Sequence, residues 1–297
     1  MPDLSPSHSP LPNHPLALIL SGGTYAPVPA PLIEEAAFVV ACDKGLQYAL
    51  AQEISVDLWV GDGDSLLEAL GQGEEEANCP SPAQDLQAED QDLLQDLHQD
   101  TQTQLQAQLH VLQARLHALQ AQYPQCLKNM EVLALPCHKD ESDTLQALLE
   151  VYRRGYRRLE LASAFGGRMD HAYANLQTLV RAKELGFTEV VARDTQTTLT
   201  VLQGGDTLSF MGPVGLTFSL FSYSEECQGV SIQGAAYPLD KGTLTQTFPL
   251  GLSNKIAPQE EGESQVTGHH LSPGLGQVNI SLDEGYLLVF VNLDASI

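Results

Sequence analysis

Residues 56–65 read VDLWVGDGDS: an apolar run of strand length, followed by a turn in which Asp62 and Asp64 alternate with glycine. A carboxylate at the end of a buried strand lowers stability unless a cation or hydrogen bonds compensate for its charge. The sequence therefore raises two questions: which kind of sheet contains this strand, and which group stabilises the two carboxylates.

Five further apolar runs of similar length occur before residue 195, and each ends in glycine or in a polar turn. In chain order the six runs are LALILSGG (16–23), AAFVVACDKG (36–45), VDLWVGDGDS (56–65), MEVLALPCHKD (130–140), RRLELASAFGG (157–167) and TEVVARD (188–194). Nearly continuous Val, Leu, Ile and Ala suit strands buried on both faces. Helical patterns lie between several runs, at residues 46–53, 143–155 and 170–186. This alternation predicts an α/β domain with a parallel sheet over residues 16–203.

The residue pattern changes after Gly204, where glycine and β-forming residues recur at short intervals and no long helical period remains. This pattern predicts a small antiparallel β-sandwich domain over residues 204–297. Residues 1–15 are rich in Pro and Ser and have no basic segment followed by an apolar one. We expect a disordered tail there rather than a signal peptide.

Residues 66–128 fit neither domain, because Gln, Asp and Leu dominate them. Five leucines follow one another at spacings of four, three, four and three residues, as in a heptad seam: Leu105, Leu109, Leu112, Leu116 and Leu119. We predict a helical, coiled-coil-like insertion that packs on its own molecule or dimerises. A dedicated binding function is the alternative.

The chain is acidic, with 14 Lys and Arg against 38 Asp and Glu and a formal net charge of -24. Nucleic-acid binders concentrate positive charge, so this balance argues against a nucleic-acid partner. No apolar run approaches the roughly 20 residues that span a membrane. The five cysteines are widely spaced and odd in number, which favours buried thiols and a cytoplasmic protein.

Glycines and carboxylates follow almost every predicted strand. The set comprises Gly22, Gly23, Asp43, Asp62, Asp64, Asp140, Asp143, Gly166, Gly167 and Asp170. Because ligands bind outside the carboxyl ends of parallel strands, we expect these residues at one edge of the sheet. Carboxylates gathered without Cys or His select a hard cation, typically Mg²⁺ bound together with substrate phosphates. A helix cap at Asp143 and an Asx turn at Asp62 and Asp64 are the structural alternatives.

The sequence GGRMDH (166–171) adds positive charge to this edge. Arg168 offers a bidentate fork for phosphate, and Asp170 opens a helix where it could hold a hydroxyl group. Lys44 and Lys139 are further candidate phosphate partners, with a solvated side chain as the alternative for each. His171 is expected to be structural. Neither a P-loop nor a dinucleotide-binding fingerprint is present.

Taken together, these motifs resemble the thiamine pyrophosphokinase family. The resemblance is carried by SGG (21–23), ACDKG (41–45), VGDGDS (60–65), KDESDTLQAL (139–148), FGGRMDHAYANL (165–176) and GLSN (251–254). It implies an α/β catalytic domain followed by a β domain, working as a homodimer. It also implies transfer of a pyrophosphoryl group from ATP to the hydroxyl of thiamine, giving thiamine diphosphate and AMP, with Mg²⁺.

The resemblance gives roles to individual residues. Asp62, Asp64 and Asp143 match acidic positions around Mg²⁺ and the ATP phosphates, and Asp43 and Asp140 match polar positions beside them. Arg168 and Asp170 match positions at the nucleotide and the thiamine hydroxyl, with Gly22, Gly23, Lys44 and Gly167 as further binding residues. Ser253 and Asn254 match a pair that lines the thiamine pocket. Tyr237 matches an aromatic residue that packs on the vitamin, with an ordinary core residue as the alternative.

Three positions depart from the family pattern: Gly63 stands where a large residue is usual, Lys44 where Gly is common, and Ser142 where Thr is usual. None of these removes a carboxylate. Two other functions stay open. One is a related pyrophosphokinase acting on another alcohol, such as a hydroxymethylpterin, and the other is a non-catalytic nucleotide-binding scaffold.

Overall fold

The computed structural model describes residues 14–62, 112–135, 141–258 and 274–293. All six strands predicted for the parallel sheet are present: β1 (Leu16–Leu20), β2 (Ala36–Cys42), β3 (Leu58–Gly61), β4 (Glu131–Ala134), β5 (Arg158–Ala162) and β6 (Glu189–Arg193). They pair in parallel in the order β4-β3-β2-β1-β5-β6. The prediction of a mixed α/β fold is confirmed.

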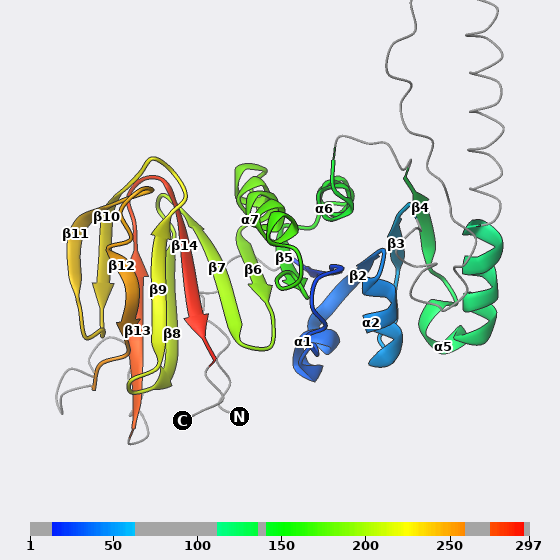
Figure 1. Cartoon of the computed structure of the whole chain (residues 1–297), viewed down its shortest axis with the longest axis horizontal. Helices are drawn as coiled ribbons and strands as arrows, with labels where there is room; N and C mark the ends of the chain where they lie inside the picture. The colour runs from blue at the N-terminus through cyan, green and yellow to red at the C-terminus, as the bar shows by residue number, and fades with distance from the viewer. Residues whose placement is uncertain (1–13, 63–111, 136–140, 259–273, 294–297) are drawn as a thin grey trace, which may run out of the picture.

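Helices cover both faces of the parallel sheet (Figure 1). They are α1 (Ala30–Glu35), α2 (Gly45–Ala51), α5 (Pro124–Leu127), α6 (Asp143–Arg153) and α7 (Met169–Glu184). The helices α6 and α7 bury Leu148 and Leu179 in a core on one face. On the other face, α2 and α5 contribute Leu46 and Leu127 to a second core around Trp59.

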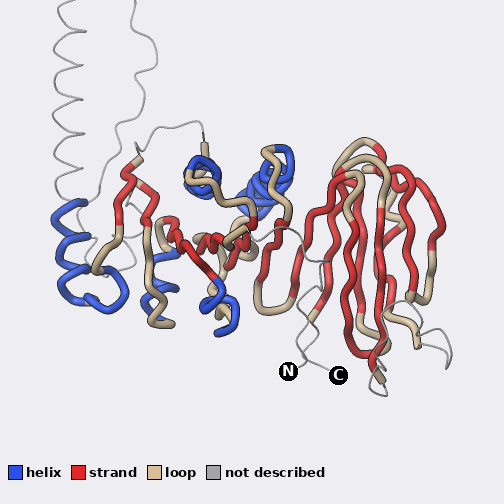
Figure 2. Tube along the Cα trace, turned by 180° about the vertical axis from the view of Figure 1, so that it is seen from behind, coloured by secondary structure: helices blue, strands red, loops and turns tan. Residues whose placement is uncertain are grey.

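The C-terminal strands pair antiparallel in the two layers of a sandwich, which begins at Thr197, before the predicted boundary at residue 204. They are β7 (Thr197–Gln203), β8 (Thr207–Pro213), β9 (Thr217–Ser222), β10 (Glu226–Gln233), β11 (Leu239–Thr245), β12 (Gly251–Lys255), β13 (Leu275–Ser281) and β14 (Tyr286–Asn292). One layer, β11-β10-β13-β8, is a separate antiparallel sheet. The other layer, β12-β9-β14-β7, continues the parallel sheet, because β7 pairs antiparallel with β6. Figure 2 shows the sandwich and the helix-covered sheet joined in this way.

The described part of the 66–128 insertion packs on its own molecule. Residues 112–122 are helical, and Leu112, Leu116 and Leu119 are buried in the second core beside Trp59. Three of the five leucines in the heptad pattern therefore bury apolar area within this chain. Leu105 and Leu109, together with most of the insertion and residues 1–13 of the predicted tail, lie outside the described residues.

Two further predictions concern cysteines and membranes. Cys42, Cys126 and Cys227 are buried thiols, and no disulfide joins them within the described part of the chain. Burial raises the pKa of the Cys227 thiol, which lowers its reactivity. Among the helices of the described ranges, none is long and apolar enough to cross a membrane.

Candidate functional site

The carboxyl ends of β1 and β5 form the centre of the candidate site. The chain leaves β1 toward β2 on one side, and β5 pairs with β1 on the other side, so the strand order reverses between these two strands. Such a reversal is the place where ligands bind in open α/β sheets. The turns after these strands stay hydrogen-bonded: the Gly23 N–H donates to Ser163 O (3.0 Å) and the Thr24 N–H to Phe165 O (2.9 Å). A β-carbon at Gly23 would collide with both carbonyl groups, so this close approach requires glycine.

Three of the predicted carboxylates lie at this edge. Asp43 follows β2 with a φ of 42°, and a β-carbon at Gly61 would collide with its carboxyl group. The Asp43 side chain therefore lies against the end of β3, immediately before Asp62. Asp143 occupies the first turn of α6, where the positive end of the helix dipole favours a carboxylate.

The alternative that Asp143 merely caps α6 is wrong. The cap is Ser142, whose Oγ accepts a hydrogen bond from the Leu145 N–H (3.2 Å). Asp143 is therefore the first helical residue after the cap, at the edge of the sheet.

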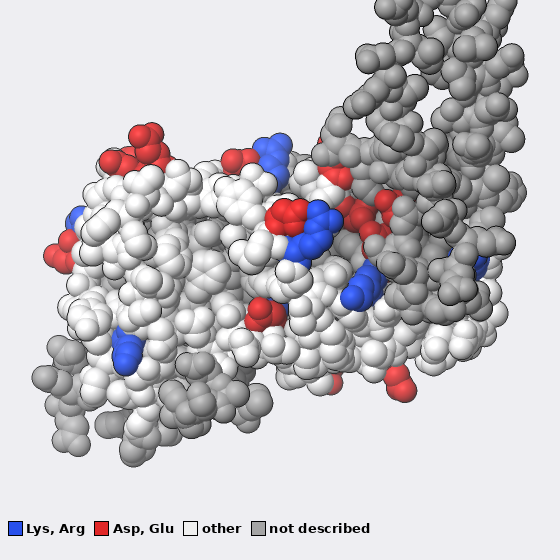
Figure 3. Space-filling view, in the orientation of Figure 1, with Lys and Arg blue, Asp and Glu red and all other residues white. Residues whose placement is uncertain are grey.

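The residues present fit a hard cation in their chemistry, because the donors at this edge are carboxylate oxygens. Within the described residues, no group of three His, Cys, Asp or Glu side chains is close enough to hold a metal ion. Asp64 and Asp140, both predicted to lie at the edge, are outside the described residues, as is Lys139. Figure 3 shows acidic side chains beside basic ones where the described surface borders the grey residues.

Arg168 and Asp170 form a bidentate ion pair where the chain enters α7. Arg168 Nε donates to Asp170 Oδ1 (3.1 Å) and Arg168 Nη2 to Asp170 Oδ2 (2.5 Å). These hydrogen bonds hold the pKa of the Asp170 carboxyl below its usual range. Both side chains are more than half exposed, so solvent screens the pair and a phosphate could displace Asp170 from Arg168 at little cost.

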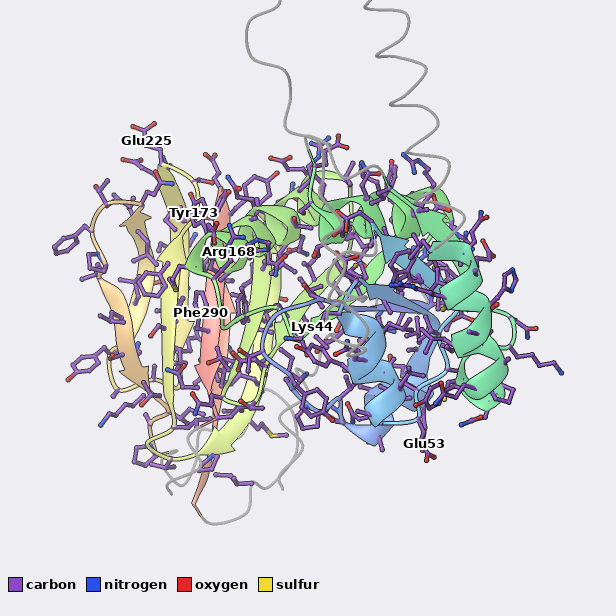
Figure 4. The ribbon with its side chains drawn as sticks, turned by 45° about the vertical axis from the view of Figure 1, so that its right-hand side comes forward. Lys44, Glu53, Arg168, Tyr173, Glu225 and Phe290 are labelled. Atoms are coloured by element: carbon purple, nitrogen blue, oxygen red, sulfur yellow. The ribbon has the colours of Figure 1, made fainter. Side chains whose placement is uncertain are left out.

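Glycine makes the approach to this ion pair possible. Gly166 and Gly167 have φ values of 85° and 66°, a region that residues with a side chain rarely occupy. On the other side of β1, Lys44 lies near the Tyr48 ring, 5.8 Å from its centroid, and the Tyr48 hydroxyl donates to Gly23 O (2.6 Å). Figure 4 shows Arg168 and Lys44 reaching the site from different elements.

A buried polar network that sequence reasoning missed connects the elements of the site. Ser21 Oγ lies 3.2 Å from Thr144 Oγ1 in α6, and Asn175 Nδ2 in α7 donates to Ala164 O (2.7 Å) and lies 3.5 Å from Ser21 Oγ. All three side chains are buried. The sequence offered one signal for it: Asn175 is a polar residue four positions before Leu179, on the apolar stripe of its helix.

The predicted thiamine residues lie at the far edge of the sheet. Tyr237 is 72% exposed, so the alternative that it is an ordinary core residue is wrong. Ser253 is also exposed, with a φ of 60°, on the edge strand β12. Asn254 is different, because it is only 5% exposed and its side chain bonds to the backbone of Tyr237.

The structure does not bring the two groups of predicted residues together within one chain. Six strand-to-strand steps separate β12 from β1 in the large sheet. At about 4.8 Å per step, β12 lies roughly 30 Å from the centre of the candidate site. Arg168, Asp170, Asp43, Asp62 and Asp143 therefore form one group, and Tyr237, Ser253 and Asn254 form another.

The fold and the first group define an α/β protein with carboxylates and an Arg–Asp pair at the carboxyl edge of its parallel sheet. Comparison with known proteins narrows this class. Residues 207–267 match the family model described as thiamin pyrophosphokinase, vitamin B1 binding domain. No curated protein sequence matches the chain.

Solved structures share the fold over nearly the whole chain. Thiamine pyrophosphokinase from Bacillus subtilis aligns with a TM-score of 0.61 at 16% identity, covering 94% of this chain and 99% of that one. The Geobacillus thermodenitrificans enzyme gives 0.58 at 19% identity, covering 95% and 99%. The Candida albicans enzyme gives 0.53 at 14% identity, covering 95% and 90%. The resemblance to the thiamine pyrophosphokinase family that the motifs predicted is confirmed.

Proposed function

We propose that this chain transfers a pyrophosphoryl group from ATP to the hydroxyl of thiamine, giving thiamine diphosphate and AMP. The observation that carries the proposal is the match of residues 207–267 to a vitamin B1 binding domain, in a chain whose parallel sheet ends in carboxylates. The same match favours thiamine over a pterin alcohol as the acceptor. The carboxylates favour catalysis over a scaffold role, because a scaffold has no need of them.

Asp62, Asp64 and Asp143 would hold Mg²⁺, which would neutralise charge on the ATP phosphates. Arg168 would exchange Asp170 for a phosphate and bind it with its fork. Once released, Asp170 would lose the partner that lowers its pKa, and it would accept a hydrogen bond from the thiamine hydroxyl. Phosphoryl chemistry of this kind depends mainly on positioning and charge stabilisation.

A second copy of the chain would complete the site. A reacting hydroxyl must come within about 3.5 Å of the phosphorus, whereas the two groups of residues are separated by six strand steps in one chain. The surface around β12 also exposes large apolar side chains: Tyr237, Phe248, Leu250 and Leu252. We therefore propose a homodimer in which Tyr237 of one copy covers the carboxylate edge of the other.

Asp62→Asn tests the proposed role of the carboxylates. It removes the charge with little change of shape, and we expect Mg²⁺-dependent turnover of ATP and thiamine to fall by about two orders of magnitude. Glu225→Gln is the matched control, because Glu225 is exposed at the far end of the sandwich (Figure 4). Full turnover by Asp62→Asn would contradict the assignment.

A further inference from the structure

Asn254 acts on Tyr237 through the backbone. Its Oδ1 accepts hydrogen bonds from the N–H groups of Tyr237 (3.1 Å) and Lys255 (2.8 Å), and its Nδ2 donates to Tyr237 O (2.8 Å). One buried side chain therefore satisfies both backbone polar groups of Tyr237. These bonds occupy the Asn254 amide on the protein itself, on the inner side of the sandwich.

The surrounding backbone presents the Tyr237 ring to solvent. The pairing of β12 with β9 is irregular between Gly251 and Asn254, and such a bulge turns side chains to a different face. On either side of Tyr237, the Ala236 N–H donates to Lys255 O (2.9 Å), and Pro238 restricts the preceding residue to extended conformations. Tyr237, which lies in this segment, is 72% exposed.

Only an amide fits the position of Asn254. Aspartate would keep the two acceptor contacts but would oppose a carboxylate oxygen to Tyr237 O, and alanine would remove all three side-chain hydrogen bonds. The requirement for both a donor and an acceptor is therefore set by the Tyr237 backbone.

We propose that Asn254 is a positioning residue that fixes Tyr237 for stacking on thiamine and does not itself contact the vitamin. This inference rests on the proposed function. A fixed Tyr237 backbone limits the positions that the ring can take, so less conformational freedom is lost when a ligand binds. These backbone hydrogen bonds would therefore strengthen thiamine binding without affecting ATP.

The test is a double-mutant cycle with Asn254→Ala and Tyr237→Ala, measured as thiamine Kd by calorimetry and as KM and kcat for each substrate. Each single variant is expected to raise thiamine Kd and KM about tenfold, with the ATP KM unchanged and no further loss in the double variant. Amide hydrogen exchange of residues 234–240 without ligands should accelerate in Asn254→Ala. If Asn254→Ala does not fold, Asn254→Asp replaces it in the same cycle.

Ser209→Ala is the matched control for loosening of the sandwich. Ser209 Oγ accepts a hydrogen bond from Gln277 Nε2 (2.7 Å), and both residues lie in the sheet that does not contain β12. It should leave thiamine binding unchanged. Additive losses in the double variant, or unchanged exchange in Asn254→Ala, would overturn the inference while the proposed function stands. A wild-type protein that binds no thiamine would overturn both, even with the exchange result intact.

Discussion

Arg168 and Asp170 are the charged residues whose pairing changes most in the proposed reaction. In the structure they bond to each other in an exposed, bidentate pair. Such a pair contributes little to stability, and in the proposed reaction it would hold both groups ready for ligands. Substitution of Arg168 should therefore change the kinetic constants and hardly change the free energy of unfolding.

Arg168→Ala is predicted to lower kcat/KM for ATP by about a hundredfold, because it removes a phosphate fork. Arg168→Lys should recover only part, since a lysine keeps the charge but cannot make two parallel bonds. Steady-state kinetics with ATP as the varied substrate measure both effects. Arg181→Ala is the matched control on the same helix, where Arg181 pairs with Glu184 (2.8 Å). Equal kinetics for the two alanine variants would refute the role of Arg168.

Residue type and spacing predicted Asp43, Asp62, Asp143 and Arg168 at one edge of the sheet, because the ends of parallel strands must meet there. The same reasoning could not find the contacts of Asn254. Its partner Tyr237 is 17 residues away, and backbone pairing of Ala235 with Ile256 brings the two together in the fold.

Among the elements, α6 begins at Asp143 and α7 follows directly after Arg168. Both helices are held against the end of β1 by Ser21, Thr144 and Asn175. Thr144→Val removes the hydroxyl that faces Ser21 and leaves a buried polar group without this contact. We expect a loss of about 1–3 kcal/mol of stability and a fall in kcat. Thr178→Val is the control, because Thr178 Oγ1 donates to Ala174 O within its own helix (3.0 Å). An equal fall in kcat for both variants would contradict the positioning role.

The helix at residues 112–122 is predicted to be part of the folded core. Leu116→Ala should lower the free energy of unfolding by about 2–5 kcal/mol, because Leu116 is 1% exposed in the second core. Urea unfolding measures the change. His117→Ala, at an exposed neighbour, should change stability by less than about 0.5 kcal/mol. Similar values for the two variants would show that this helix is not needed for the core.

Periodicity predicted the strands and long helices well, because apolar runs and helical stripes are local features. It did not predict α1, which has only six residues and no buried side chain. Nor did it indicate that β7, β14, β9 and β12 extend the parallel sheet. Strand pairing between distant segments is set by tertiary packing, which a local sequence pattern does not predict.

For the whole molecule, the continuous ten-stranded sheet leads directly to the proposed shared site. If each site uses carboxylates of one copy and Tyr237 of the other, coexpressed Asp62→Asn and Tyr237→Ala chains should complement each other. Half of the randomly formed dimers would then contain one intact site, giving about a quarter of the wild-type number of sites. Turnover of the purified mixture tests this. Activity no higher than the mean of the two separate variants would place the whole site within one chain.

The most direct test of the central claim is to identify the products formed from ATP, Mg²⁺ and thiamine by the purified protein. We expect thiamine diphosphate and AMP in equal amounts, with no thiamine monophosphate accumulating, because the pyrophosphoryl group moves as a unit. Formation of ADP with thiamine monophosphate would contradict pyrophosphoryl transfer. The absence of any thiamine product from folded, ATP-binding protein would contradict the proposed acceptor.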